Sequence, residues 1–138
     1  MDPYRIVLME KHAMLRQALR KIIEEERDFE VIEETGTGDE LFDFLECTKS
    51  GPDMVILDLF APTLKGIEGM RRLKLLHTTV KVLVLSLYEN HEYLHEVLSN
   101  GAEGYLLKKD ANTELLSAIA RIREGGIYQP PLLCGKQM

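Results

Sequence analysis

Short apolar runs alternate with helix-like segments five times along this chain of 138 residues. The runs are residues 6–9, 29–32, 54–57, 80–87 and 105–107. Between them apolar side chains recur at helical spacing, as at Leu15, Leu19 and Ile22 in the first segment. Strands separated by helices form parallel sheets through right-handed crossovers, and continuous apolar strands are typical of sheets covered on both faces. The sequence therefore predicts an α/β fold, a five-stranded parallel sheet with helices on both faces.

The order of the apolar runs also carries expectations about position in the sheet. We expect the third, fourth and fifth runs to be central and the second, which contains Glu30 and is followed by Glu33, to lie at an edge. Beyond Gly125-Gly126 the residues Tyr128-Gln129-Pro130-Pro131 cannot continue a helix. The end of the chain is therefore expected to be an extended linker.

Charged and hydroxyl side chains stand at the ends of four of the five runs. Glu10 and Lys11 follow the first, Asp58 follows the third, Ser86 is near the end of the fourth and Lys108 follows the fifth. The carboxyl ends of parallel strands meet at one edge of the sheet, where ligands bind. Two acids, a hydroxyl and two ammonium groups are the parts needed to hold a phosphoryl group on a carboxylate, with Asp58 as the nucleophile.

Composition excludes several other classes of function. The formal net charge of −6 argues against a nucleic-acid surface within this chain, because phosphate backbones require clustered Lys and Arg. Cys47 and Cys134 show neither metal-ligand nor disulfide spacing and are expected to be reduced thiols. No apolar run is long enough to span a bilayer, so a soluble, cytoplasmic protein is expected. No glycine-rich phosphate loop follows the first run, which disfavours a nucleotide-binding enzyme.

Four stretches together carry a resemblance to a known family. They are residues 5–8 with 15–19, the spacing Asp58…Pro62…Gly66, residues 82–86 and residues 101–108. Over about residues 4–125 the chain resembles a response-regulator receiver domain of two-component systems. It is most similar to the LuxR/FixJ-type branch, whose receivers precede a helix-turn-helix domain. The resemblance implies a flavodoxin-like, doubly wound sheet with strand order 2-1-3-4-5.

The resemblance assigns a role to each residue at the predicted sheet edge. It implies Asp58 as phosphoacceptor, Ser86 as switch hydroxyl, Tyr105 as switch aromatic and Lys108 as phosphate-binding lysine. Tyr105 fits equally well as a half-buried aromatic without a switch role. Such a module is not an enzyme, beyond assisting phosphorylation and dephosphorylation of its own aspartate.

Lys11 departs from the family pattern at the metal site. In such receivers Mg²⁺ is held by an acid pair after the first strand, by the acceptor Asp58 and by a backbone carbonyl, here that of Phe60. The acid pair aligns with Glu10-Lys11, so a lysine replaces one carboxylate ligand. Two unit charges about 4 Å apart near a surface interact by roughly 1–4 kcal/mol. Lys11 therefore weakens the case for Mg²⁺ as a cofactor.

Two hypotheses follow from Lys11. In the first the chain is a phosphorylatable receiver in which Lys11 supplies part of the missing positive charge. In the second it is a phosphorylation-independent pseudo-receiver, a protein-interaction or dimerisation module in which Lys11 replaces Mg²⁺ as the counter-ion of Asp58. Phosphorylation by Mg²⁺ and acetyl phosphate separates the two.

The resemblance also predicts domain organisation and partners. Residues 1–125 are expected to form the receiver domain and residues 126–138 a linker toward a C-terminal output domain outside this chain. The expected partners are a sensor histidine kinase and a second copy of the protein, with DNA contacted only through the output domain and no membrane contact. The expected role is a phosphorelay step that regulates transcription, relayed through the surface of the fourth helix, fifth strand and fifth helix.

Overall fold

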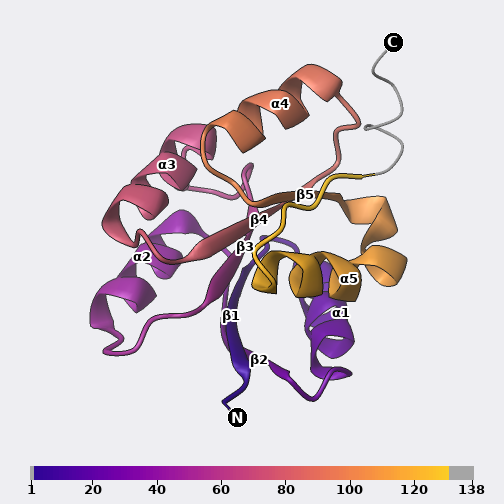
Figure 1. The fold of residues 1–138 in the computed structure, drawn as a ribbon. Coiled ribbons are helices and arrows are strands. Elements are labelled where there is room, and N and C mark those ends of the chain that lie inside the picture. The colour runs from indigo at the N-terminus through magenta and orange to yellow at the C-terminus, as the bar shows by residue number, and fades with distance from the viewer. Residues whose placement is uncertain (1, 131–138) are drawn as a thin grey trace.

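The computed structural model describes residues 2–130. Within these residues five strands alternate with five α-helices (Figure 1). The elements are β1 (Tyr4–Met9), α1 (Ala13–Glu24), β2 (Phe29–Thr35), α2 (Gly38–Cys47), β3 (Met54–Asp58), α3 (Gly66–Leu76), β4 (Lys81–Ser86), α4 (His91–Ser99), β5 (Gly104–Leu107), a turn of 3-10 helix η1 (Lys108–Asp110) and α5 (Ala111–Arg123). Among these described residues no helix is long and apolar enough to cross a membrane.

The strands form one parallel sheet in the order β2-β1-β3-β4-β5. The predicted α/β class and strand order are confirmed. The pairing of β1 with β2 shifts register between Ile6 and Val7, while the pairing of β1 with β3 is regular. Because β1 pairs with β2 on one side and with β3 on the other, it is a central strand, and its carboxyl end lies beside that of β3.

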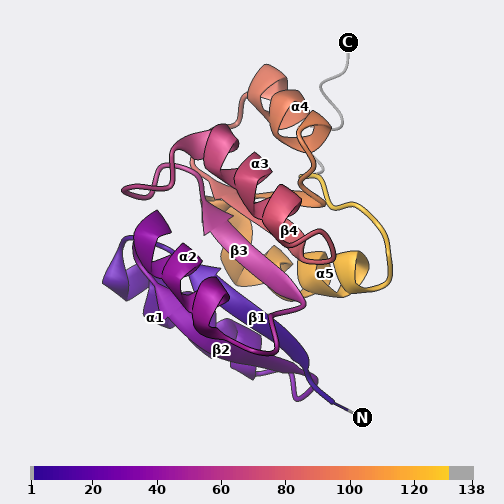
Figure 2. The same cartoon turned by 90° about the vertical axis from the view of Figure 1, so that its left-hand side faces the viewer.

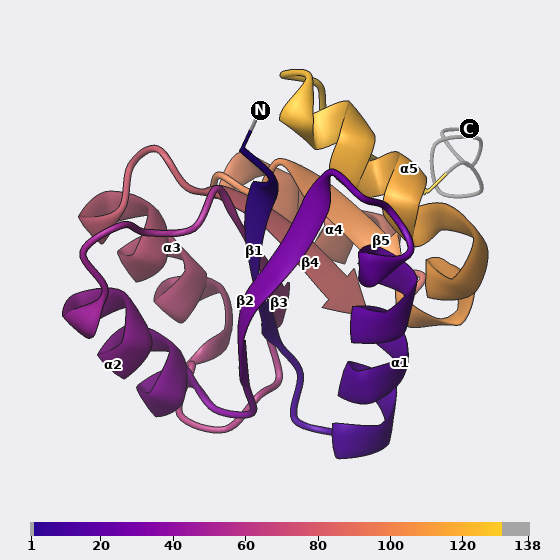
Figure 3. The same ribbon diagram turned by 90° about the horizontal axis from the view of Figure 1, so that it is seen from below.

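The helices cover the sheet in two layers. Figures 2 and 3 show α1 and α5 on one face and α2, α3 and α4 on the other. Successive strand residues point to opposite faces, and β1 divides accordingly. Ile6 and Leu8 belong to the core under α1 and α5, whereas Val7 and Met9 belong to the core under the other three helices. Both faces are apolar because both are covered.

The fifth strand was expected to be central, but it lies at the edge of the sheet beyond β4. All four of its residues are nevertheless buried, because residues 127–129 run alongside its free edge (Figure 1). The Tyr128 N–H donates to the Glu103 carbonyl and the Tyr105 N–H donates to the Tyr128 carbonyl, both at 3.0 Å. This pairing, with the burial of the Tyr128 side chain, explains why β5 has the composition of a central strand.

The predicted extended linker is described only in part. Residues 126–130 follow α5 and pack on β5, while residues 131–138, including Cys134, lie outside the described range. The Tyr128 hydroxyl donates to Glu114 Oε1 at 3.0 Å, which fixes this segment to α5 as well as to β5. Cys47 is an exposed free thiol.

The loop after β3 is held in a defined shape. Lys65 and Gly66 have positive φ angles of 71° and 59°, in the left-handed region that glycine adopts without strain. Further along α3, a Cβ on Gly69 would come within 1.8 Å of the Leu64 carbonyl oxygen, so only glycine allows the loop to lie against the helix. The conformation of this loop determines where the backbone that follows Asp58 lies.

Candidate functional site

The fold brings the predicted polar residues to the carboxyl edge of the sheet. Glu10 follows β1, Asp58 ends β3, Ser86 ends β4 and Lys108 begins η1 after β5. Glu10 is fully buried, and Asp58 and Ser86 are each 2% exposed. Carboxylates rarely reach this degree of burial without a cationic partner.

Lys108 is that partner for both acids. Its Nζ lies 2.9 Å from Glu10 Oε1 and 3.1 Å from Asp58 Oδ2, and its side chain is 9% exposed. The contact with Asp58 is a hydrogen bond, whereas Glu10 Oε1 has no well-aligned donor and is held by charge alone. One ammonium therefore balances two carboxylates, which leaves the buried cluster with a formal charge of −1.

The remaining carboxylate oxygens are bound by backbone groups nearby. Asp58 Oδ1 accepts a hydrogen bond from the Phe60 N–H at 2.9 Å. Glu10 Oε2 accepts from the His12 N–H at 2.9 Å and lies 3.1 Å from His12 Nδ1. The Glu10 carboxylate is thus turned inward and held at both oxygens.

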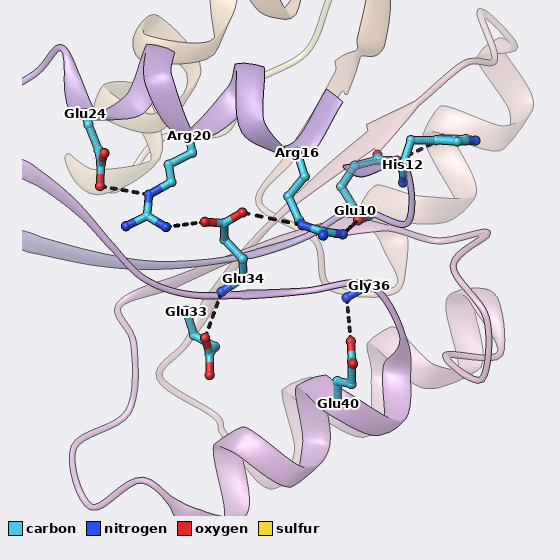
Figure 4. Close-up of polar contacts among 9 residues, drawn as sticks. All are labelled: Glu10, His12, Arg16, Arg20, Glu24, Glu33, Glu34, Gly36 and Glu40. Atoms are coloured by element: carbon cyan, nitrogen blue, oxygen red, sulfur yellow. Dashed lines mark hydrogen bonds and ion pairs between the residues drawn. The ribbon is translucent and has the colours of Figure 1, made fainter. Parts of the chain in front are cut away.

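Arg16 and His12 belong to the site although the sequence did not single them out (Figure 4). Arg16 on α1 donates from its guanidinium to the Glu10 backbone carbonyl at 2.6 Å, and its Nε lies 3.4 Å from Glu34 on β2. Glu34 also pairs with Arg20 one turn further along α1. The sequence feature that could have indicated Arg16 is an arginine within the amphipathic pattern of the first helix. In the structure this arginine holds the backbone of Glu10.

A small cavity of about 200 Å³ opens over Asp58. The residues that line it are Lys11, His12, Asp58, Phe60, Leu87, Tyr88 and Lys108. Glu10 lies outside its lining, and Asp58 is the sole acid that it presents in the described part of the chain. A larger hollow of about 860 Å³ lies along α4, beside Phe60 and Tyr93, and contains none of the strand-end residues. The small cavity is therefore the candidate site.

Lys11 does not form the ion pair with Asp58 that one hypothesis required. It is exposed and forms no ion pair with any residue in the range 2–130. Lys11 lies in the bend between β1 and α1, and it lines the cavity while the neighbouring Glu10 is buried. The counter-ion of Asp58 is Lys108, and the pseudo-receiver hypothesis loses its structural basis.

Ser86 and Tyr105 form a buried network of their own beside the cavity. The Tyr105 hydroxyl lies 2.9 Å from Ser86 Oγ and 2.7 Å from the Tyr88 carbonyl oxygen. The Tyr88 N–H donates to Ser86 Oγ at 3.0 Å. Tyr105 is fully buried, not half-buried, and burial raises the pKa of its phenol, an effect that the hydrogen bond with Ser86 partly offsets. The Ser86 hydroxyl is thus bound to Tyr105 rather than directed at Asp58.

The donors at the site do not fit a Mg²⁺ ion. Mg²⁺ requires octahedral oxygen ligands, of which one or two are usually carboxylates. Both oxygens of Glu10 are already engaged, and the cavity presents one carboxylate together with two lysines. Across residues 2–130 there is no group of three or more His, Cys, Asp or Glu side chains that could hold a metal ion. A divalent cation would meet two lysines and one carboxylate in the lining of this cavity.

Comparison with known proteins identifies the class. The response regulator receiver domain family matches residues 6–120. The chain belongs to this family, whose members are signalling proteins and generally not enzymes. More narrowly, its relatives make it a receiver domain of the LuxR branch of response regulators.

The relatives themselves are bacterial regulators. The chain is 34% identical over 127 residues to the transcriptional regulatory protein DegU of Brevibacillus brevis, with 92% of this chain and 53% of DegU covered. It is 31% identical over 128 residues to the oxygen regulatory protein NreC of Staphylococcus carnosus, with 92% and 58% covered. The chain thus spans little more than half the length of these curated relatives.

Solved structures agree with this placement. The response regulator RcsB of Salmonella typhimurium superposes with a TM-score of 0.90 at 26% identity, over 97% of this chain and 66% of that one. A LuxR-family two-component response regulator from Aurantimonas sp. superposes with a TM-score of 0.87 at 26% identity, over 98% and 95% of the two chains.

Proposed function

We propose that Asp58 accepts a phosphoryl group and that the chain acts as a phosphorylation-dependent receiver module. The observation that carries this proposal is the Asp58 carboxylate, buried at the base of a cavity open to solvent and bound to the Lys108 ammonium. A carboxylate that served structure alone would not need an opening toward solvent. A phosphoryl donor can reach the Asp58 carboxylate through this cavity. The Lys108 ammonium, which would bind the transferred phosphoryl oxygens, already lies beside Asp58.

The residues around Asp58 have separate roles in phosphoryl transfer. An Asp58 oxygen attacks the phosphorus, and the Phe60 N–H and Lys108 orient the carboxylate. Lys108 then binds the phosphoryl oxygens as a point charge. In this sense the chain assists its own modification without acting as an enzyme on another substrate.

Ser86 and Tyr105 are proposed to convert phosphorylation into a change of packing. A phosphoryl group on Asp58 offers new acceptor oxygens to the Ser86 hydroxyl, which is now bound to Tyr105. If Ser86 turns to the phosphoryl group, the Tyr105 phenol loses a partner and repacks. Tyr105 contacts Tyr93 on α4, with ring centroids 6.1 Å apart, so the change reaches the surface formed by α4, β5 and α5.

The wider role follows the relatives and remains part of the proposal. We place residues 1–125 as the receiver domain and residues 126–138 as the path toward a LuxR-type output domain in a cytoplasmic protein. A histidine kinase is the proposed phosphoryl donor, and pairing of two copies is the proposed response. The proposal agrees with solved RcsB dimers bound to DNA, and with DegU being a transcriptional regulatory protein.

Acetyl phosphate tests the proposal directly. The purified chain is incubated with acetyl phosphate and MgCl₂, and its intact mass is measured over time. We expect the gain of one phosphoryl group in the native chain and in Asp43→Asn, a control that removes an exposed acid from α2. We expect no gain in Asp58→Asn. A gain in Asp58→Asn equal to that of the native chain, or no gain in any of the three, would overturn the proposal.

A further inference from the structure

The cavity over Asp58 has an excess of positive charge at its wall. Lys11 and Lys108 both line it, and His12 adds an imidazole, against the single carboxylate of Asp58. Glu10 lies beneath and outside the lining, where it is fully buried and paired. Counting the buried acid as well, two ammonium groups balance two carboxylates. At the cavity wall an incoming phosphoryl group meets two lysines, whereas a divalent cation finds a single carboxylate ligand.

We propose that Lys11 is a second phosphoryl-binding cation, so that Asp58 accepts and retains a phosphoryl group without a divalent metal ion. This inference rests on the proposed function of Asp58. It adds that the cation beside Lys108 in the phosphorylated site is the Lys11 ammonium and not a metal ion. Lys108 would bind the phosphoryl oxygens from the β5 side of the cavity and Lys11 from the β1 side.

Lys11 is suited to this role because it is uncommitted. Lys108, the other lysine that lines the cavity, is already paired with both Glu10 and Asp58. Lys11 is exposed, has no ion pair within residues 2–130 and sits on a flexible four-carbon stem. Moving its ammonium onto a phosphoryl group therefore breaks no existing contact.

The charge change on phosphorylation favours this movement. On phosphorylation the single negative charge of the Asp58 carboxylate is replaced by a phosphoryl group with a charge of about −1.5 to −2 at neutral pH. Lys108 alone already balances Glu10 and Asp58 incompletely. The added negative charge therefore favours a further cation at the cavity, and Lys11 is an exposed residue of its lining.

The transfer balances without any further reactant. A bond forms between an Asp58 oxygen and the phosphorus, and the bond from phosphorus to the donor's bridging oxygen breaks. The electron pair of that bond leaves with the donor group, which is acetate when acetyl phosphate is used. Both lysines remain protonated throughout, and nothing is oxidised or reduced.

Phosphorylation with and without metal tests the inference. Intact mass is followed after addition of acetyl phosphate, in EDTA and in MgCl₂, for the native chain, Lys11→Ala, Lys11→Asp and Lys109→Ala. The last variant is the matched control, because it removes an ammonium next to Lys108 that lies outside the cavity and is paired with Glu89. Circular dichroism of each variant confirms that the fold is retained.

We expect the native chain and Lys109→Ala to react at similar rates in EDTA and in MgCl₂. Lys11→Ala should react about tenfold more slowly in EDTA, a change that corresponds to about 1.4 kcal/mol in the barrier. Lys11→Asp should react only in MgCl₂, because it restores a carboxylate ligand and removes the cation.

Two results would overturn the inference. If the native chain reacts only in MgCl₂, Asp58 is still the acceptor but Lys11 does not replace the metal ion. If the native chain reacts in neither buffer while Lys11→Asp reacts in MgCl₂, Lys11 blocks the site instead of serving it. Failure of all variants in both buffers is a different outcome, because it rejects the proposed function of Asp58 itself.

Discussion

The Lys108 ammonium lies 3.1 Å from Asp58 Oδ2, although fifty positions separate the two residues in the sequence. Both side chains are almost entirely buried. Because a buried carboxylate is costly without a counter-ion, this pair supports the fold as well as the chemistry.

Removing Lys108 should destabilise the protein strongly. Lys108→Met leaves Glu10 and Asp58 buried without their shared cation, which is expected to cost about 3–5 kcal/mol in the free energy of unfolding. Adding Asp58→Asn removes one of the two unbalanced charges and should restore part of that loss. Urea unfolding followed by circular dichroism measures both effects. Lys109→Met, at an exposed position, should change the stability little, and equal losses for the two lysines would contradict this account.

Removing the Tyr105 hydroxyl should uncouple α4 from the site. Tyr105→Phe loses the hydrogen bonds to Ser86 and to the Tyr88 carbonyl at a cost of about 1 kcal/mol in stability. Phosphorylation of Asp58 should persist, while the amide chemical-shift changes that it causes along α4 should shrink. Tyr88→Phe is the control, because Tyr88 joins this network through its backbone. If phosphorylation causes the same amide chemical-shift changes along α4 in Tyr105→Phe as in the native chain, the signal does not pass through this phenol.

The segment after α5 should behave as part of the sheet. Tyr128→Ala removes a side chain that is 7% exposed, at an expected cost of about 3 kcal/mol in the free energy of unfolding. It should also speed hydrogen exchange at the Tyr105 amide, whose acceptor is the Tyr128 carbonyl. Ile127→Ala, at a neighbouring position that is 54% exposed, should change both quantities far less. Identical behaviour of the two variants would mean that this segment is a free linker.

Stability should fall at alkaline pH because several tyrosines titrate late in the folded protein. Burial raises the pKa of Tyr4 and of Tyr93 to about 12, from 10.0 in an unperturbed tyrosine. Between these values the unfolded chain has released the proton and the folded chain has kept it. The contribution is therefore complete below about pH 10 and is lost as the pH rises to about 12. Urea unfolding from pH 8 upward measures this fall, and Tyr93→Phe should make it shallower. A stability that stays level over this range, or falls equally in Tyr93→Phe, would contradict the assignment.

Much of the fold could be predicted because it depends on patterns local to each element. The alternation of apolar runs and helical segments specified the class, and the rule that ligands bind at strand carboxyl ends brought Glu10, Asp58, Ser86 and Lys108 to one edge. The prediction that β5 is a central strand was wrong for a physical reason. Its composition is that of a covered strand, and the cover comes from Tyr128 as well as from helices.

The details of the site depend on side-chain direction, which patterns do not specify. Sequence spacing placed Glu10 and Lys11 together, but in the folded chain Glu10 is buried and Lys11 is exposed. Which lysine pairs with Asp58 was therefore not readable from spacing. The bond between Ser86 and Tyr105 likewise depends on the rotamers of two residues 19 positions apart.

The central claim is that Asp58 itself becomes the phosphorylated residue, and chemical trapping measures this most directly. After reaction with acetyl phosphate, borohydride reduces an acyl phosphate to an alcohol, and peptide mass spectrometry then locates the altered aspartate. The account predicts that residue 58 is converted to homoserine in the native chain and that Lys108→Met lowers the yield. Conversion at a different acid, with residue 58 recovered unchanged as aspartate, would contradict it.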